Sequence, residues 1–430
     1  MAHLLIVELP GGNDVDILQA ARERGDEFSF LSSDLAHYLR QPLVRAELCH
    51  ALEQIEVPGF DYAEVEQSVL EVHARRPIAA VLCLIDIRLI VAARLAQRLG
   101  LRHLNPESAT LLRDKFSVRC RLLERGMVQP DFALADSNLS LKQAVQRLGL
   151  PVLVKPADGY GSQNVVVLRE PEDLAPWLSP LEDMLPSHAD YGLGVRANDR
   201  LVVERHMTGT VVGCDTLTVN GQHRLLGVNE KRFFEPPSFA IQGGCFIPNG
   251  PAYQEIEDYV FSTLDAVGFD WGASHVELML APEGPRLIEI NARLVGAKIP
   301  RLVGYALGRS LHDDLISVHL GRWPQQPICA DLCGVAVTRW IVADSEGILQ
   351  SVTTPDWTDP RIRCVELVKQ PGDPVRRPFE NADRIGYVMA CAAHRVEAEA
   401  LAEAFVAQTT VTLQAAPSFH ATRTLADCTP

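Results

Sequence analysis

The amino-acid sequence predicts a multidomain protein in which an α/β domain is followed by α+β domains. Strand and helix signals alternate over the first hundred residues, a pattern typical of a parallel sheet covered by helices. Short strands with tight turns replace this pattern between residues 127 and 322. New strands and an amphipathic helix follow Pro324. A chain of 430 residues is long enough for about three domains of ordinary size.

The first domain is expected over residues 1–108 and is Rossmann-like. Its strand signals are the apolar runs at 4–7, 28–31 and 79–86, and an amphipathic helical stretch covers 14–24. The loop after the first run, ELPGG, lacks the GxGxxG spacing of a dinucleotide site, so its glycines are expected only to turn the chain. A Rossmann-type dehydrogenase is therefore disfavoured.

Two further domains are expected, over residues 109–324 and 325–430. A helical segment that ends at Gly126 is followed by the extended sequence MVQPDF, which indicates a junction. The segments VLVKPADGYGSQNVVVL and LVVERHMTGTVVGCDTLTVNG then predict antiparallel strands. The last part has strand signals at 334–342 and 384–393 and predicts a small α+β domain.

The charge of the chain argues against a broad nucleic-acid surface. There are 40 basic and 55 acidic residues, a net charge of -15, so any anionic ligand must be held by local basic groups. The N-terminus lacks a basic region followed by a long apolar run, and charged residues interrupt the most apolar segment, 78–96. We therefore expect no signal peptide and no membrane span. The ten cysteines form no CxxC pair, which favours reduced thiols in the cytoplasm.

The stretch HVELMLAPEGPRLIEINAR, residues 275–293, predicts a hairpin that carries acidic groups. Alternation puts Glu277 on one face of its strand and Glu289 and Asn291 together with Leu287 on one face of the return strand. A symmetric loop centred on Glu283 places Glu277 directly across from Glu289, a like-charge pair that calls for a cation between them. Carboxylate and amide oxygens suit magnesium. The alternative is a solvated face with two unrelated glutamates.

A glycine-rich loop follows Lys155 in the sequence LVKPADGYGSQNVVVL. Gly159 and Gly161 let backbone N–H groups approach an oxyanion, Ser162 adds a hydroxyl, and the lysine supplies a charge. The segment is not a P-loop, because no GK[ST] follows. A plain hairpin with a surface lysine is the alternative at this point.

Six segments in order resemble the ATP-grasp superfamily, specifically its carboxylate–amine ligase branch, which contains L-amino-acid (dipeptide) ligases and carnosine-synthase-like enzymes. The segments are NPESATLLRDKFSVRCRLLERGMVQPDF, LVKPADGYGSQNV, VVERHMTG, NEKRFFEPPSF, HVELML and IEINARLVGAKIPRLVGYALG. The resemblance implies an ATP-grasp fold with a Rossmann-like N-terminal domain, a two-subdomain nucleotide clamp and a small C-terminal domain. The lid subdomain is expected at about 127–205 and the second subdomain at about 206–324.

The resemblance also implies a role for each matching residue. Lys115, Lys155 and Lys231 contact the ATP phosphates, over which Gly161, Ser162 and Gln163 close. Glu204 reaches the adenine amine, and backbone groups near His206 and Met207 read the ring edge. Glu277, Glu289 and Asn291 hold two magnesium ions, for which manganese can substitute, and Arg293 stabilises the reacting acyl group. His275, Gly296 and Lys298 belong to the substrate pocket. Many family members hold the ribose with an acidic residue where this chain has Val211.

The implied reaction is an ATP-dependent ligation. A carboxylate takes the γ-phosphate to give an acyl phosphate and ADP, and an amine, such as that of an amino acid, then displaces phosphate to give an amide. The expected partners are ATP and the two small substrates, and the expected assembly is a homodimer. The alternatives are another ATP-grasp activation, such as bicarbonate-dependent carboxylation, and a nucleotide-binding protein without catalysis.

Overall fold

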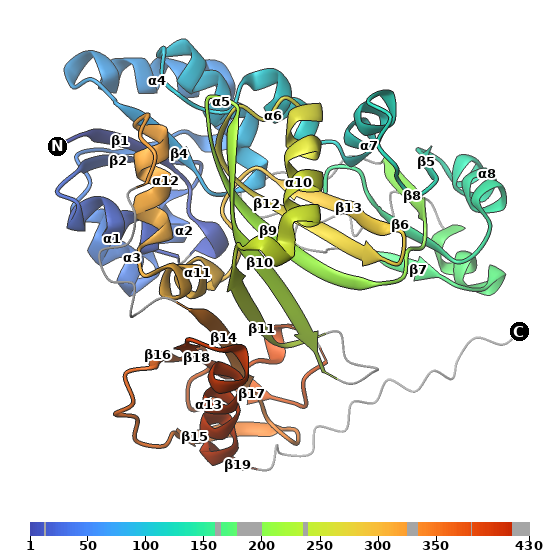
Figure 1. Ribbon diagram of the computed structural model, residues 1–430. Helices are drawn as coiled ribbons and strands as arrows, with labels where there is room; N and C mark the ends of the chain where they lie inside the picture. The colour runs from blue at the N-terminus through green and yellow to red at the C-terminus, as the bar shows by residue number, and fades with distance from the viewer. Residues whose placement is uncertain are drawn as a thin grey trace, which may run out of the picture. The chain divides into compact units, whose positions relative to one another are not determined.

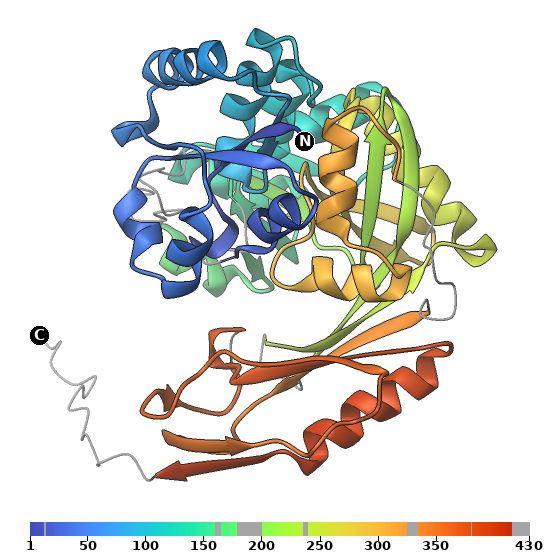
Figure 2. The same ribbon diagram turned by 90° about the vertical axis from the view of Figure 1, so that its left-hand side faces the viewer.

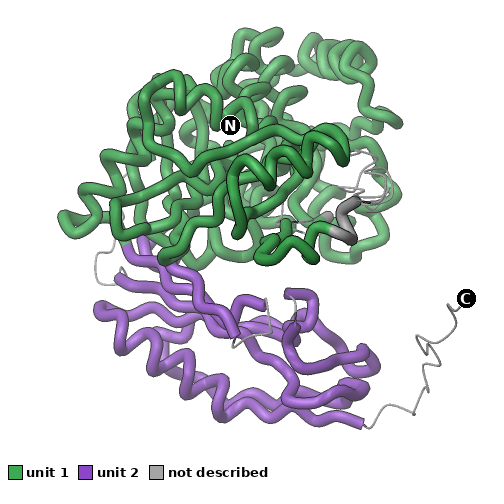
Figure 3. Tube along the Cα trace, turned by 90° about the vertical axis from the view of Figure 1, so that its right-hand side faces the viewer, with its two compact units in different colours: residues 1–229, 248–304, 309–328 green, residues 230–247, 305–308, 329–430 purple. Residues whose placement is uncertain are grey.

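The computed structural model describes residues 1–12, 14–159, 165–178, 200–234, 240–324, 334–379 and 381–414. These residues form two compact units (Figure 3). Unit 1 comprises residues 1–229, 248–304 and 309–328, and unit 2 comprises 230–247, 305–308 and 329–430. The division into three domains stays a prediction, because each of the two units combines segments that are separated in the sequence and neither matches a predicted domain.

The N-terminal part of unit 1 is a parallel sheet, as the alternating strand and helix signals predict. Its strands are β1 (His3–Val7), β2 (Glu27–Ser32), β3 (Gln54–Glu56) and β4 (Ala80–Cys83), in the order β3-β2-β1-β4 (Figure 1). The accompanying helices are α1 (Asp16–Glu23), α2 (Leu35–Leu39), α3 (Pro42–Leu48), α4 (Tyr62–Arg75) and α5 (Leu89–Arg98). Because β1 and β4 are parallel neighbours, the loops that follow them meet at one edge of the sheet.

Two capped helices lead from this sheet to a second one. Helix α6 (Pro106–Leu112) begins at Asn105 and α7 (Lys115–Glu124) begins at Asp114, and both cap side chains accept backbone N–H bonds. The second sheet has the order β5-β8-β6-β7. Its strands and its helix are β5 (Phe132–Ala135), β6 (Val152–Pro156), β7 (Val166–Leu168), β8 (Leu201–Arg205) and α8 (Asn138–Leu148).

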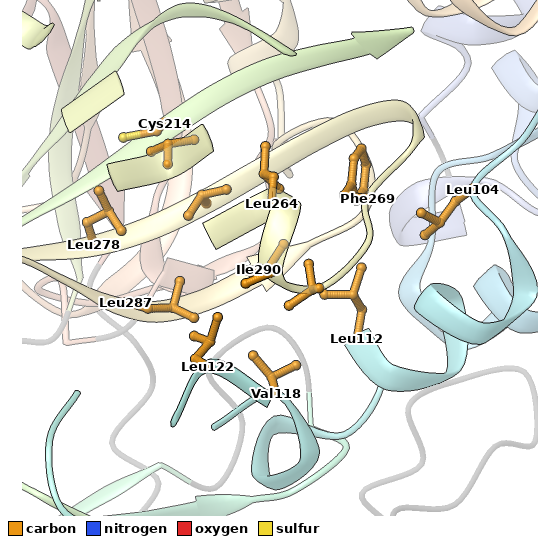
Figure 4. Close-up of a cluster of buried hydrophobic side chains, with 14 of the residues drawn as sticks. Leu104, Leu112, Val118, Leu122, Cys214, Leu264, Phe269, Leu278, Leu287 and Ile290 are labelled. Carbon is orange, nitrogen blue, oxygen red and sulfur yellow. The ribbon is translucent and has the colours of Figure 1, made fainter. Parts of the chain in front are cut away.

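A sheet of long strands completes unit 1. Its strands are neighbours in an eight-stranded sheet and lie in the order β13-β12-β9-β10, from β9 (Thr210–Val219), β10 (Gln222–Phe233), β12 (Trp271–Ala281) and β13 (Gly284–Asn291). Residues 222–229 of β10 belong to unit 1 and residues 230–233 to unit 2. Helix α10 (Gln254–Ala266) packs on one face through a core in which Leu264, Leu278 and Leu287 take part (Figure 4). Two more helices follow, α11 (Ile299–Leu307) and α12 (Leu311–His319). Helix α12 lies beside the N-terminal part, where Arg24 donates to Ser317 Oγ at 3.2 Å (Figures 1 and 2).

Unit 2 is an antiparallel α+β structure, as the C-terminal strand and helix signals predict. One sheet contains β11 (Ile241–Pro248), β14 (Val335–Ile341), β18 (Gly386–Ala392) and β16 (Ile362–Leu367), in that order. A smaller sheet contains β17 (Pro374–Val375), β15 (Gly347–Thr353) and β19 (Thr410–Gln414). Helix α13 (Arg395–Gln408) packs on the first sheet through Ala398, Ala402 and Phe405. Within the described ranges, no helix has both the length and the apolar character needed to cross a membrane.

Candidate active site

The acidic hairpin is formed by β12 and β13, and the predicted pairing of Glu277 with Glu289 is confirmed. The turn, however, is shorter than expected: Ala281 pairs with Gly284, and the extra residue is a bulge at Ile288. The predicted facing of Leu287 is therefore wrong. Leu287 and Ile290 both pack in the core, because the bulge interrupts the alternation between them (Figure 4).

Cationic side chains contact the polar groups of this hairpin. Lys115 Nζ lies 3.0 Å from Glu289 Oε1, and Arg293 Nη2 donates to Asn291 Oδ1 at 3.3 Å. The side chains of Glu277 and Glu289 are each 23% exposed, so a ligand can reach both. No three acidic, histidine or cysteine side chains gather as a metal cluster within the described part of the chain. Two carboxylates and an amide fit magnesium, which keeps water and phosphate oxygens as its other ligands.

His275 lies beside this acidic pair and is buried. Its Nδ1 is 2.8 Å from Asp215 Oδ1 on β9, and its Nε2 is 3.4 Å from Glu277 Oε1. Burial alone would lower the pKa of His275, but Asp215 and Glu277 outweigh it and raise the pKa to about 9. Asn229 donates to the other oxygen of Asp215. The predicted position of His275 next to Glu277 is confirmed.

A buried charge cluster holds Lys155 and Glu204. Lys155 Nζ lies 3.0 Å from Glu204 Oε2, and Arg119 donates to both oxygens of Glu204 at 2.9 and 3.2 Å. Burial raises the pKa of Glu204, but Arg119 and Lys155 outweigh it and bring the pKa to about 2. Burial lowers the pKa of the Lys155 ammonium group, and the neighbouring Glu204 carboxylate offsets only part of this lowering. The Glu204 carboxylate is thus engaged by two cations, Arg119 and Lys155, and its role toward the adenine amine stays a prediction.

The sequence-based interpretation missed Arg119. Its guanidinium also donates to Ile288 O at 3.5 Å, and Lys155 Nζ donates to the same carbonyl at 3.4 Å. The bulge therefore ties the hairpin to this cluster. The sequence contained one indication of its position: Arg119 follows Lys115 by four residues on α7, so the two side chains share one face of the helix.

The other residues that were predicted to bind ATP lie in three different parts of the chain. Gly161, Ser162 and Gln163 lie outside the described residues, but Gly159, just before them, accepts a hydrogen bond from Lys115 Nζ. His206 and Met207 follow β8, and the His206 N–H donates to Pro151 O at 3.1 Å. Burial lowers the pKa of His206. Lys231 lies on β10 within unit 2.

Arg293, the predicted catalytic residue, is bound to Asp86, which the sequence-based interpretation also missed. Arg293 Nε and Nη2 lie 2.7 and 2.6 Å from Asp86 Oδ2. Burial raises the pKa of Asp86, but Arg293 and then Arg113 outweigh it, so the net shift is downward. Burial lowers the pKa of Arg293, whereas Asp86 raises it above the ordinary value. Its position in the sequence could have indicated Asp86, because it follows β4 at the edge of the sheet where ligands of parallel sheets bind.

A cavity of about 370 Å³ opens beside this pair. Its walls come from the loop after β1, the loop after β4 and the segment after β13, and its lining also includes Asp14, His37, Tyr38, Pro300 and His312. Gly296 lines the cavity, and its place in a substrate pocket stays a prediction. Lys298 instead donates to Asp14 Oδ1 at 2.9 Å and to Asp16 Oδ1 at 3.4 Å.

Two protein families match parts of this chain. The ATP-grasp domain family matches residues 148–300, which include β6, β8 and the acidic hairpin. The family described as L-amino acid ligase C-terminal domain 2 matches residues 339–414, which lie in unit 2.

Individual proteins are similar over most of the chain. The uncharacterized protein y4rH of Sinorhizobium fredii is 27% identical and the match covers 82% of this chain and 72% of that protein. The L-arginine-specific L-amino acid ligase of Bacillus subtilis is 23% identical, over 75% and 76% of the two chains. The crystal structure of L-amino acid ligase from Bacillus licheniformis superposes with a TM-score of 0.73 at 18% identity, covering 96% of this chain and 99% of that one. Residues 148–300 are therefore an ATP-grasp domain and residues 339–414 an L-amino acid ligase C-terminal domain 2, and this combination together with the relatives indicates an ADP-forming carbon–nitrogen ligase.

Proposed function

We propose that the protein activates a small carboxylic acid as an acyl phosphate at the expense of ATP and joins it to an amine. The observation that carries this proposal is the directly paired Glu277 and Glu289, with Lys115 and Arg293 bonded to the same hairpin. Acidic groups that hold magnesium and basic groups that bind phosphate are both required for phosphoryl transfer. The hairpin offers them within a few residues.

The proposed reaction has two steps, phosphoryl transfer to the carboxylate and then formation of the amide. An oxygen of the substrate carboxylate attacks the γ-phosphorus, and the bond from that phosphorus to the oxygen of ADP breaks. The amine nitrogen then attacks the acyl carbon, phosphate leaves with the bonding electrons, and the nitrogen loses a proton. The first step is needed because a free carboxylate is a poor electrophile, and positioning of the two reactants contributes much of the acceleration.

The charged residues take the roles that their positions support. Glu277, Glu289 and Asn291 would hold two magnesium ions, and the metal would disperse negative charge on the phosphoryl oxygens. Lys115 and Lys155 would bind phosphate oxygens together with Lys231 and the backbone of Gly161, Ser162 and Gln163. Arg293 would bind the oxygens of the acyl phosphate, for which a guanidinium fork is well shaped.

We propose a different role for Glu204 from the predicted contact with the adenine amine. Because Arg119 and Lys155 engage both oxygens of Glu204, we assign that carboxylate to holding Lys155 in place. Backbone groups near His206 and Met207 are then the donors and acceptors proposed for the ring edge. The proposed homodimer is a separate matter that sedimentation velocity can decide.

The decisive experiment supplies purified protein with ATP, magnesium and a pool of amino acids, and measures nucleotide and product mass. ADP, phosphate and a condensed amide should form together, and Glu289→Gln should abolish all three. Hydroxylamine in place of the amine should give the hydroxamate of the activated acid. Release of AMP, or amide formation without ATP, would contradict the proposal. Product formation that requires bicarbonate but no amine would favour the carboxylation alternative.

A further inference from the structure

Arg119 is a buried cation on helix α7 that contacts two other parts of unit 1. Its side chain is 2% exposed, so no ligand reaches it. Val118 and Leu122, on the same helix, pack in one core with Leu287 and Ile290 of β13 (Figure 4). Helix α7 is thus fixed against the acidic hairpin, and the Arg119 guanidinium is fixed with it.

Arg119 and Lys155 share the same two acceptors. The guanidinium donates to both oxygens of Glu204, at 2.9 and 3.2 Å, and to Ile288 O at 3.5 Å. Lys155 Nζ lies 3.0 Å from Glu204 Oε2 and 3.4 Å from Ile288 O. An ammonium group has three N–H donors, so these contacts leave one donor for a phosphate oxygen. Because Arg119 engages both oxygens of Glu204, that carboxylate does not depend on Lys155 alone.

Ile288 links Arg119 to the end of the hairpin that is proposed to bind magnesium. Ile288 is the bulged residue, and Glu289 follows it directly. A bulge leaves one residue outside the regular pairing, and bulges beside active sites aim a side chain. Here the Ile288 carbonyl accepts from Arg119 and Lys155, which fixes the peptide plane that leads into Glu289.

We propose that Arg119 is a positioning residue that holds Lys155 and Glu289 in one fixed arrangement. It acts on the lysine through the Glu204 carboxylate and on the glutamate through the Ile288 carbonyl. The inference rests on the proposed function, which gives phosphate to Lys155 and magnesium to Glu289. One buried residue that touches neither ligand then controls two properties, the affinity for the nucleotide phosphates and the gain in affinity that magnesium provides.

The test measures the dissociation constant of ADP by calorimetry, first in EDTA and then with excess magnesium. The affinity in EDTA reports on Lys155, and the factor by which magnesium improves it reports on Glu289. Arg119→Lys keeps the charge but cannot make the planar set of bonds of a guanidinium. It should weaken both the affinity in EDTA and the magnesium factor, each by about tenfold, since a hydrogen bond to a charged group is worth about that much.

Three further variants separate the two properties. Lys155→Met should weaken ADP binding in EDTA and keep the magnesium factor, because Arg119 still holds Ile288. Glu289→Gln should lose the magnesium factor alone. Arg121→Lys is the matched control on the same helix: the Arg121 side chain is 32% exposed and pairs with Glu124, so both quantities should stay unchanged.

Gln129→Ala carries the test where circular dichroism shows that Arg119→Lys does not fold. The Gln129 amide accepts from Arg119 Nη1 at 3.4 Å and donates to Arg119 O at 2.9 Å, and it bonds no other residue in the described ranges. Loosening Arg119 in this way should weaken both quantities by a smaller factor, about threefold.

The outcomes separate the inference from the function on which it rests. If both quantities are unchanged in the folded variant, Arg119 is only structural and the inference is overturned. Loss of one quantity alone also overturns it, because Arg119 then does not join the two sites. Wild-type protein that binds ADP without any gain from magnesium overturns the proposed role of the acidic hairpin. Wild-type protein that binds no ADP overturns the proposed nucleotide site, and the inference with it.

Discussion

Arg293 Nε donates a hydrogen bond of 2.7 Å to Asp86 Oδ2, and Nη2 lies 2.6 Å from the same oxygen, so that this ion pair joins the end of the acidic hairpin to the loop after β4. The contact fixes the direction of the guanidinium before any substrate is bound. Asp86 is therefore a positioning residue for Arg293.

Asp86→Asn should lower kcat with little effect on the KM for ATP, because Arg293 loses its anchor while the nucleotide groups are unchanged. A fall of about 10- to 100-fold is expected, since misplacing a reacting group by about 1 Å costs that much. Steady-state kinetics by ADP release measures it. Glu66→Gln, which removes the charge of a half-buried partner of the exposed Arg98, is the matched control and should behave as the wild type. An unchanged kcat in Asp86→Asn would show that Arg293 is held by other contacts.

Arg119→Met should unfold at a lower urea concentration than the wild type. The substitution leaves Glu204 buried with Lys155 as its remaining cation, and breaking a buried ion pair typically costs about 3 to 5 kcal/mol. Arg205→Met breaks an ion pair with Asp131 whose side chains are 56% and 69% exposed, and such a pair is worth about 1 kcal/mol or less. Similar losses of unfolding free energy in the two variants would contradict the assignment of Arg119 to a structural charge cluster.

Acid should destabilise the protein partly through Glu204. Its folded-state pKa is about 2 against an ordinary value of 4.5, so its contribution to stability is present above pH 4.5 and is lost as the pH falls toward 2. In that window the unfolding free energy of the wild type should fall more steeply than that of Glu204→Gln, by up to about 1.4 kcal/mol per pH unit. Urea titrations at several pH values give both slopes. Parallel slopes would mean that Glu204 titrates normally.

Magnesium with ADP should raise the melting temperature of the wild type and have little effect on Glu289→Gln. Ligand at 100 times its dissociation constant stabilises by about 2.7 kcal/mol, whereas a site that lacks one of its carboxylates binds far less metal. Differential scanning fluorimetry with and without EDTA gives the comparison. Glu283→Gln alters the turn of the same hairpin and should keep the full shift. A shift that survives in Glu289→Gln would place the metal elsewhere.

The sequence predicted local features well and long-range partners poorly. Glu277 and Glu289 are close in the chain, so alternation and a turn were sufficient to pair them, although Ile288 shows that the pattern could not reveal a bulge. Asp86 and Arg119 depend on tertiary packing: each contacts a residue more than 80 positions away. Nothing in periodicity links such positions, and the side chain of Glu204 was consequently assigned to adenine although two cations engage it.

Gly213 provides a test of the His275 position that changes no charged group. Gly213 pairs with Glu277 across β9 and β12, and a Cβ atom there would lie 2.4 Å from His275 Cε1. Gly213→Ala must therefore displace the imidazole from Asp215 and Glu277, and overpacking of this kind costs about 1 to 3 kcal/mol. We expect lower thermal stability and a reduced ADP-forming rate. Gly250→Ala is the control, because its Cβ meets no atom within 4 Å and its backbone is extended at a φ of -167°. Wild-type activity in Gly213→Ala would show that the reaction does not depend on the contact between His275 and the acidic hairpin.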